Sequence, residues 1–310
     1  MNSLKNNSKS QRILATMWKD RWMYMLLIPG ILYYTLFVYK PMWGVLFSFQ
    51  NYSVTRGFWG SEWVGLEHFR RFVSGMWVGR LFRNTIILAL LNLIFYFPAP
   101  IILALLLNEL KNQVFKRTVQ SITYLPHFLS WVVITSIFQN LLTIESGSVN
   151  VLLRSLGYSP ISFLQIPSWF RPLILTQIIW REIGWGTIIF LAALASVDVE
   201  LYEAAIVDGA SHLNRLWHIT LPGIRSVIVI MLILRMGNFM NTGFEQIFLM
   251  TNSMNRDVAE VFDTYIYRIG IQSGQFSYST AVGLFKSVIG LVLVVSSDRI
   301  AKRLGEEGIL

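Results

Sequence analysis

The sequence predicts an all-α polytopic membrane protein, and three observations support that fold class. Hydrophobic residues make up 54% of the 310 residues and charged residues only 14%, whereas a soluble domain usually carries about a quarter charged residues. The apolar residues gather in six long runs, each close to the roughly 20 residues that a helix needs to cross a bilayer. Cysteine is absent, which excludes disulfides, thiolate metal sites and a cysteine nucleophile.

The six apolar runs predict six membrane-spanning helices. The first follows a polar, basic segment and is too long for a signal-peptide core, so we expect it to be retained. Its Lys40-Pro41 pair predicts a kink near one end. The second and third contain no Asp, Glu, Lys or Arg, whereas the last three do. The predicted spans are 22–47, 85–107, 119–142, 173–197, 224–248 and 280–297.

Lysine and arginine in the connections predict the orientation in a bacterial cytoplasmic membrane. With the N-terminus inside, every lysine of the loops faces the cytoplasm, and the arginines of the first outer loop weigh less because that loop is long. The net charge of +9 fits basic loops against an anionic inner leaflet, not nucleic-acid binding. The predicted divisions are a cytoplasmic N-terminal segment 1–21, a transmembrane domain 22–297 and a cytoplasmic tail 298–310.

The polar connection 198–223 lies between two apolar spans. Asp198 is placed to cap a helix with acidic residues in its first turn. Gly209 is placed to end that helix in the left-handed conformation. Ser211 is placed to cap a second helix that Pro222 closes. We therefore expect helix, turn and helix on the cytoplasmic surface, and amphipathicity alone leaves open a plain interfacial helix.

The exact spacing within 198–223 resembles the cytoplasmic-loop signature of permease subunits of binding-protein-dependent ABC importers. That signature reads E-A-A, three residues, G, nine residues, I, one residue, L-P. Many members carry a further proline where this chain has Ser226. Stretches such as "WVGLEHF", "SITYLPHFLSWVV" and "NTGFEQIFLMTN" look like the carbohydrate-uptake branch, and more narrowly its polysaccharide or oligosaccharide subfamily. The matching positions are Glu203, Ala204, Ala205, Gly209, Ile219, Leu221 and Pro222, with Asp208 beside the glycine.

The resemblance implies a type I ABC importer permease fold in which 198–223 is a coupling segment. This segment would dock on a separate ATP-hydrolysing subunit, with Glu203 as the main polar contact and Gly209 as the turn. The implied partners are a second, similar permease subunit, two ATP-binding subunits, an extracellular solute-binding protein and an oligosaccharide or polysaccharide. ATP and magnesium would bind in the partner subunits, since the chain has no G-x-x-x-x-G-K-[ST] loop. We expect no enzyme activity, cofactor or metal in this chain.

Ionisable and aromatic residues in the fourth and fifth spans mark a candidate substrate pathway. Intramembrane charges usually face a bundle interior or a water-filled path, and aromatic faces beside polar groups suit sugar rings. The alternative is structural: Arg181 with Glu182, or Arg235 with Glu245, would pair to hold helices together. Lys286 is predicted as a structural or interfacial lysine that snorkels. The candidate pathway residues are Trp180, Arg181, Glu182, Trp185, Arg235, Asn238, Asn241 and Glu245.

Two other functional classes stay open at this point. An intramembrane glycosyl or lipid transferase would need acidic residues at a membrane face, for which Asp257 and Asp263 are the nearest candidates. A secondary transporter would show paired inverted repeats, and none is visible in the sequence. His212 and His218 do not have the i, i+4 spacing of a helical metal pair. On the outer side, 64–77 is predicted as a surface helix whose basic residues are either solvated or dock the binding protein.

Overall fold

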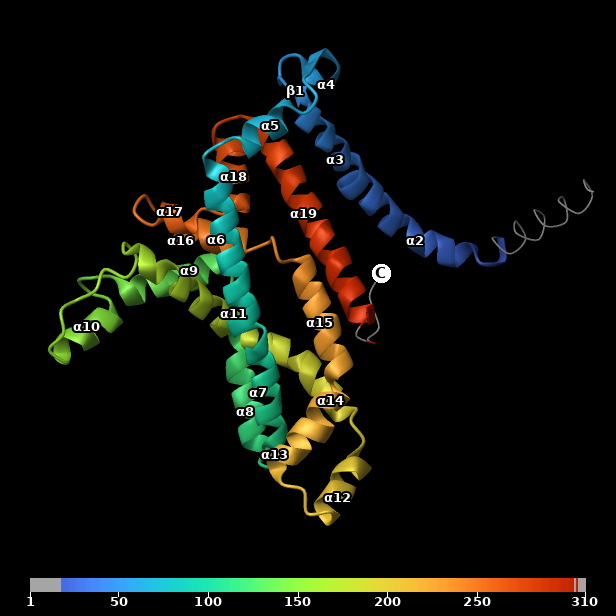
Figure 1. Ribbon diagram of the computed structural model, residues 1–310, viewed down its shortest axis with the longest axis vertical. Coiled ribbons are helices and arrows are strands. Elements are labelled where there is room, and N and C mark those ends of the chain that lie inside the picture. Colours follow the sequence, from blue (N-terminus) through green and yellow to red (C-terminus); the bar gives the residue numbers. More distant parts are fainter. Residues whose placement is uncertain (1–17, 304, 306–310) are drawn as a thin grey trace, which may run out of the picture.

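The computed structural model describes residues 18–303 and residue 305, and helices make up nearly all the regular structure of that part (Figure 1). Its two strands, β1 (Gln50–Asn51) and β2 (Glu62–Trp63), form a short antiparallel hairpin. Four helical segments are long and apolar enough to cross a membrane, and the number is six if each of two sharply bent helix pairs counts as one span. The all-α prediction is confirmed. Five of the predicted spans overlap the four long segments and one bent pair, Gln113–Phe128 with Trp131–Leu142, whereas the other bent pair, His212–Gly223 with Arg225–Gly237, shares only 225–237 with the predicted fifth span.

The first span is a continuous helical run whose first part, α2 (Arg21–Tyr33), lies apart from the other helices (Figure 1), and none of its most apolar window is buried within the chain. Its last part, η2 (Trp43–Phe49), packs against α19 (Phe276–Arg303). A π-helical turn directly precedes the α-helical turn that contains Pro41, whose ring clashes with the carbonyl four residues earlier in an ordinary α-helix. The parts are α2 (Arg21–Tyr33), η1 (Tyr34–Tyr39), α3 (Lys40–Met42) and η2 (Trp43–Phe49). The hairpin follows with α4 (Gly57–Gly60), and then α5 (Glu67–Val73) forms within the predicted surface helix 64–77.

The second span starts about two turns before the predicted 85–107. Its parts are α6 (Trp77–Leu91), η3 (Asn92–Tyr96) and α7 (Pro98–Glu109). The additional turns carry Arg80 and Arg83, charges that lie beyond the uncharged run used to place the span. The hydrophobic run therefore marked the part of the helix that is apolar throughout, while the helix itself continues into polar sequence.

The third predicted span, 119–142, is not one helix, which corrects the prediction. Its parts are α8 (Gln113–Tyr124), η4 (Leu125–Phe128) and α9 (Trp131–Leu142), and the chain bends by 104° between η4 and α9. Pro126 supplies no N–H, and Leu129 is extended. The Ser130 hydroxyl accepts the N–H of Val133 and begins a new helix. A proline and a capping serine therefore break a run that is apolar throughout.

The fourth span is a single helix, α11 (Pro167–Ala195), which follows α10 (Ser148–Ser155). It packs closely on α8 and α7 through two glycines. A Cβ at Gly184 would overlap the carbonyl oxygen of Thr123, and a Cβ at Gly186 would lie 2.9 Å from Cγ of Pro100. Small residues at these positions let the backbones approach one another.

The fifth predicted span, 224–248, is also broken, which is a second correction. The helix α15 (Arg225–Gly237) ends at a link, 238–243, after which α16 (Phe244–Met250) begins. The side chain of Asn238 donates to the Leu234 carbonyl at 3.3 Å. Gly243 has φ of +88°, a conformation that favours glycine. A polar cap and a left-handed glycine therefore stop the helix although the sequence stays largely apolar.

The last helix, α19 (Phe276–Arg303), extends beyond the predicted span 280–297 at both ends. The short helices that precede it are α17 (Arg256–Ala259), α18 (Phe262–Tyr267) and η6 (Arg268–Gln272). The predicted tail 298–310 therefore starts within a helix. Residues 304 and 306–310 of that tail, and residues 1–17 of the predicted N-terminal segment, lie outside the described residues.

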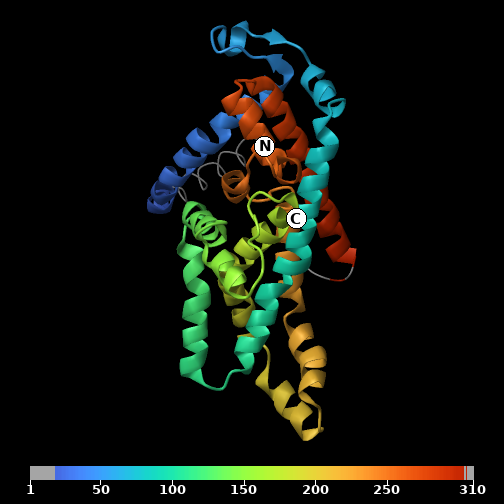
Figure 2. The same ribbon diagram turned by 90° about the vertical axis from the view of Figure 1, so that its left-hand side faces the viewer.

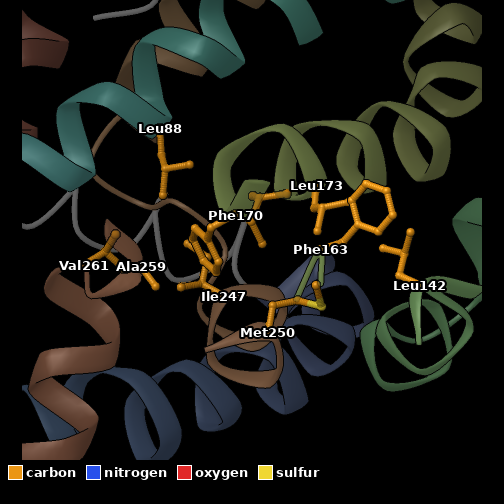
Figure 3. Close-up of a cluster of buried hydrophobic side chains, with 10 residues drawn as sticks. Leu88, Leu142, Phe163, Phe170, Leu173, Ile247, Met250, Ala259 and Val261 are labelled. Carbon is orange, nitrogen blue, oxygen red and sulfur yellow. The ribbon is translucent and has the colours of Figure 1, made fainter. Parts of the chain in front are cut away.

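Three clusters of buried side chains join helices that are distant in sequence. The first packs Leu88 of α6, Phe170 of α11 and Ile247 of α16 together (Figure 3). The second joins α5, α6, α18 and α19 around Phe72 and Phe262. The third joins α7, α11 and the start of α15, and its buried members are Ala104, Phe190, Leu194 and Ile224. Figures 1 and 2 place the β-hairpin and the 198–223 segment at opposite ends of the molecule.

Candidate functional site

The 198–223 segment folds as two short helices joined by a tight turn, as predicted. The parts are α12 (Val199–Val207), α13 (His212–Arg215), η5 (Leu216–Thr220) and α14 (Leu221–Gly223). The Asp198 carboxylate accepts the N–H of Glu200 at 2.9 Å, and the Ser211 hydroxyl accepts the N–H of Asn214 at 3.3 Å. Gly209 lies between the helices with φ of +72°. The predicted caps and the left-handed glycine are therefore confirmed.

A substitution at Gly209 tests the effect of backbone conformation separately from that of side-chain contacts. A Cβ at this position would meet no atom within 4 Å, so a substitution acts only through φ, which costs a residue with a Cβ roughly 1–2 kcal/mol. We expect Gly209→Ala to loosen the segment and to speed its cleavage in limited proteolysis. Gly209→Asn should be cleaved more slowly than the alanine variant, because asparagine tolerates this region. Equal cleavage of wild type and Gly209→Ala would contradict this account.

The helix α12 presents an uncovered face, since none of its residues is buried within the chain. Glu203 and Ala204 are exposed, Ala205 is half-buried, and Asp208 and Gly209 are exposed at the turn. Four large apolar side chains of the helix are also exposed, namely Val199, Leu201, Ile206 and Val207. A carboxylate beside small and apolar residues on one short helix forms a surface suited to contact with another protein.

The other side of the segment is tied to the membrane helices. The Tyr202 hydroxyl donates to the Thr220 hydroxyl at 3.0 Å, and Thr220 is buried. A Cβ at Gly223 would lie 2.8 Å from a methyl of Val197, and Ile224 is fully buried in the third cluster. Among the remaining predicted positions, Ile219 and Leu221 are half-buried and Pro222 is exposed. The Tyr202–Thr220 hydrogen bond joins the two halves of the segment, and the contacts of Gly223 and Ile224 join it to the end of α11 and the start of α15.

A cavity of about 380 Å³ separates the segment from the ends of α7 and α11. Polar side chains line part of it, and Nε2 of His212 lies 3.5 Å from a carboxylate oxygen of Glu109. Both of these side chains are more than half exposed, so the contact contributes little free energy. It does place the second half of the segment next to the end of the second span.

The predicted pathway residues of α11 surround the bend in the third span. Arg181 forms an ion pair with Glu182, which bears out the pairing hypothesis for these two residues. Nε of Arg181 donates to the Leu129 carbonyl at 3.2 Å, and its guanidinium lies 4.6 Å from the ring centroid of Trp131. Trp180 packs against Phe138 of α9. Arg181 therefore holds both sides of the bend between η4 and α9.

His127 belongs to this group, although sequence reasoning did not select it. Its Nδ1 lies 2.9 Å from a carboxylate oxygen of Glu182, and its ring stacks on Trp185 with centroids 4.4 Å apart. Placement next to Pro126 in an otherwise uncharged span was the signal that could have identified it. Arg181, Glu182, Trp185 and His127 form one connected group, and its charged members are engaged with one another.

The predicted pathway residues of α15 and of the 238–243 link lie around a second, separate cavity. Arg235, Asn238 and Asn241 lie around a cavity of about 10 Å³. The side-chain oxygens of Asn92 and Thr242, which also line it, are buried without a hydrogen-bond partner among the described residues. A cavity of this size holds about one water molecule. A sugar ring does not fit into a cavity of this size.

Arg235 does not pair with Glu245 in the part of the chain that the structure describes, which rules out that predicted pair there. Its guanidinium lies 4.8 Å from the ring centroid of Tyr96 on the second span. Glu245 is exposed in the first turn of α16. Tyr96 lies within electrostatic range of both Arg235 and Glu182. A band of charged and aromatic residues thus runs from the bend in the third span to the break in the fifth.

Lys286 does not snorkel to a surface, which corrects that part of its prediction. It is 8% exposed, forms an ion pair with Asp263 and lies 2.5 Å from the side-chain oxygen of Asn241. The other acidic residue considered for a metal, Asp257, pairs with Arg80 at 2.6 Å. Within residues 18–303, no three His, Cys, Asp or Glu side chains come together in a way that could hold a metal ion. Both candidates of the transferase hypothesis are therefore occupied by cations of the chain.

Comparison with known proteins decides the family. The profile of the "Binding-protein-dependent transport system inner membrane component" family matches residues 96–306. The chain belongs to this family. Two relatives from Bacillus subtilis (strain 168) are similar over nearly their whole length. Protein LplB is 56% identical over 96% of this chain and 93% of its own. The polygalacturonan/rhamnogalacturonan transport system permease protein YteP is 50% identical over 97% and 94%.

The fold of this binding-protein-dependent permease also matches solved structures of ABC transporters. A chain of the bacterial alginate ABC transporter, solved with an alginate pentasaccharide-bound periplasmic protein, matches with a TM-score of 0.89 and 36% identity over 96% of this chain and 100% of that chain. The predicted type I ABC importer permease fold is confirmed by this match. The family assignment makes the chain a membrane component of an ABC transport system that works with a solute-binding protein. It is a transport subunit and not a catalytic one.

Proposed function

We propose that this permease is one half of the membrane pore of an importer for oligosaccharide or polysaccharide chains, driven by ATP hydrolysis in separate subunits. The observation that carries the proposal is the two-sided 198–223 segment. One side is fastened to the ends of α11 and α15 through the contact of Gly223 with Val197 and the burial of Ile224, while the Tyr202–Thr220 hydrogen bond joins the two halves of the segment. The other side leaves Glu203 and Ala204 uncovered. A segment built in this way transmits a displacement from a docked protein to the membrane helices.

The proposed substrate class is an acidic sugar chain. The relatives are named for polygalacturonan and rhamnogalacturonan transport and for import of the acidic polysaccharide alginate. Arg235, with the amides of Asn238 and Asn241, supplies a cation and hydrogen-bonding groups to the small polar cavity, and arginine suits the recognition of carboxylates. In this proposal these three residues contact the sugar, whereas Arg181 and Glu182 maintain the bend of the third span.

The proposed assembly contains a second, similar permease subunit, two ATP-binding subunits that supply ATP and magnesium, and an extracellular solute-binding protein. The 198–223 segment then faces the cytoplasm, as do both termini, and the β-hairpin end faces the binding protein. This orientation agrees with the lysines in the connections. The uncovered first span is also consistent with a chain that is incomplete on its own.

The experiment that tests the proposal compares Glu203→Ala with Glu200→Ala in the complete reconstituted transporter. Both residues are exposed acids of α12, so the second variant is the matched control. We expect Glu203→Ala to lower binding-protein-stimulated ATP hydrolysis and sugar uptake by about tenfold, the effect of losing a charge-assisted hydrogen bond. Glu200→Ala should stay close to wild type. Normal ATP hydrolysis and sugar uptake by Glu203→Ala would contradict the coupling role and identify 198–223 as a plain interfacial helix.

A further inference from the structure

Lys286 is a buried cation in the last described span. One of its partners, Asn241, lines the small polar cavity beside Arg235. A lysine at a mainly apolar helix position is costly unless it is paired. Here α19 places Lys286 at 8% exposure against the Asp263 carboxylate of α18 and the side-chain oxygen of Asn241, which is 2.5 Å from Nζ. One buried ammonium therefore joins the last helix, the short helix α18 and the 238–243 link.

The Lys286 ammonium fixes the orientation of the Asn241 amide. An ammonium donates hydrogen bonds and cannot accept them, so it takes the oxygen of Asn241 and turns the amide nitrogen away. That nitrogen donates to the side-chain oxygen of Asn238 at 3.3 Å. The nitrogen of Asn238 in turn donates to the Leu234 carbonyl at 3.3 Å. The relay therefore runs from Asp263 through Lys286 to both amides that line the cavity beside Arg235.

We propose that Lys286, held by Asp263, is a positioning residue that sets which amide atoms the pathway presents to the sugar. Both asparagines are partly exposed in this chain, so their remaining hydrogen-bonding capacity is open to a ligand. If the ammonium were absent, the Asn241 amide could turn by half a rotation and exchange its donor and acceptor. This inference rests on the proposed function of Asn238 and Asn241 as sugar contacts.

A charge reversal separates positioning from simple structural support. The double variant Lys286→Asp/Asp263→Lys restores an ion pair between the same helices. It also places an acceptor next to Asn241, which reverses the amide. Glu260→Gln is the matched control, because Glu260 is another buried carboxylate in an ion pair, with Arg268 at 2.7 Å, and neither residue lines the cavity.

The measurement uses the complete transporter in liposomes with its solute-binding protein and a labelled alginate or galacturonate oligosaccharide. Uptake and ATP hydrolysis are both measured at saturating loaded binding protein. We expect Lys286→Met and the charge reversal to reduce sugar imported per ATP by about tenfold, a ratio typical of a lost polar contact. The charge reversal should recover thermal stability and stimulated hydrolysis. Glu260→Gln should keep the wild-type ratio.

The outcomes that would overturn the inference are distinct from failure of the proposed function. If the charge reversal restores the ratio together with stability, Lys286 is a structural residue only. If Asn241→Ala lowers the ratio but Lys286→Met leaves it unchanged, the relay does not position the amide. If the wild-type transporter imports no sugar, or Asn238→Ala and Asn241→Ala leave uptake unchanged, the proposed pathway itself is wrong.

Discussion

Replacement of Gly184 by alanine is expected to prevent correct packing of the third and fourth spans. A Cβ at this position would overlap the carbonyl oxygen of Thr123 and lie 2.8 Å from a ring carbon of Tyr124. The first of these atoms belongs to the backbone of α8, so relief requires the two helices to separate. Inserting even one methyl group into a packed interior costs about 1–3 kcal/mol, and the immovable backbone puts Gly184→Ala at the upper end of that range or beyond.

The measurement is the thermal unfolding midpoint of detergent-purified protein, together with the yield of monodisperse material. Gly290→Ala is the matched control, because Gly290 also lies within a helix, α19, and a Cβ there would meet no atom within 4 Å. That variant should be at least as stable as wild type, since alanine favours a helix over glycine by about 1 kcal/mol. Equal midpoints for the Gly184 and Gly290 variants would show that α8 and α11 do not pack as described.

Removing the Glu182 carboxylate alone is expected to destabilise the protein strongly, and removing the Arg181 charge as well is expected to restore part of that stability. The two side chains are 20% and 18% exposed, and Glu182 also faces His127. Glu182→Leu leaves the Arg181 guanidinium without its carboxylate, a change that costs about 3–5 kcal/mol at buried sites. The double variant Arg181→Met/Glu182→Leu removes the unpaired charge as well, so part of the lost unfolding temperature should return. The contacts of Arg181 with the Leu129 carbonyl and Trp131 stay lost in this variant.

The same two variants also distinguish a structural role from a pathway role. If the pair has only a structural role, the folded fraction of the double variant should transport sugar at a rate close to wild type. A stable double variant that imports no sugar would contradict the structural role. It would instead assign Arg181 or Glu182 to the pathway, as the first of the two sequence hypotheses had it.

Features of the fold that depend on local sequence were predicted well. The apolar runs identified the spans because a helix that crosses the bilayer must be apolar over a length that the bilayer thickness sets. Asp198, Gly209 and Ser211 identified the helix boundaries of the 198–223 segment because capping and positive φ depend on the residue itself. The E-A-A signature identified the family on the same segment, and the comparisons confirmed it.

Features that depend on distant partners could not be predicted. The breaks at Ser130 and Asn238 involve local side-chain bonds, and the prediction missed them for a different reason, since hydropathy does not register a capping side chain. One of the two sequence hypotheses paired Arg235 with Glu245 of the same apolar run, yet Arg235 faces Tyr96 of another span. Lys286 was treated as a lone charge because its partner, Asp263, becomes a neighbour only when α18 folds against α19. The contacts of Arg235 and Lys286 are made by tertiary structure and leave no periodic signal in the sequence.

The isolation of the first span has a consequence for mutational scanning. Residues 21–43 are exposed throughout, and none of the apolar window of Arg21–Phe49 is buried by the rest of the chain, so substitutions before η2, which packs against α19, remove few contacts that this chain makes with itself. Sensitivity to substitution along this helix therefore records what surrounds it in the cell. Positions that face lipid should accept any apolar residue, and positions that face a neighbouring subunit should be selective. A saturation scan of this one helix would thus give a footprint of its neighbours without purification of the assembly.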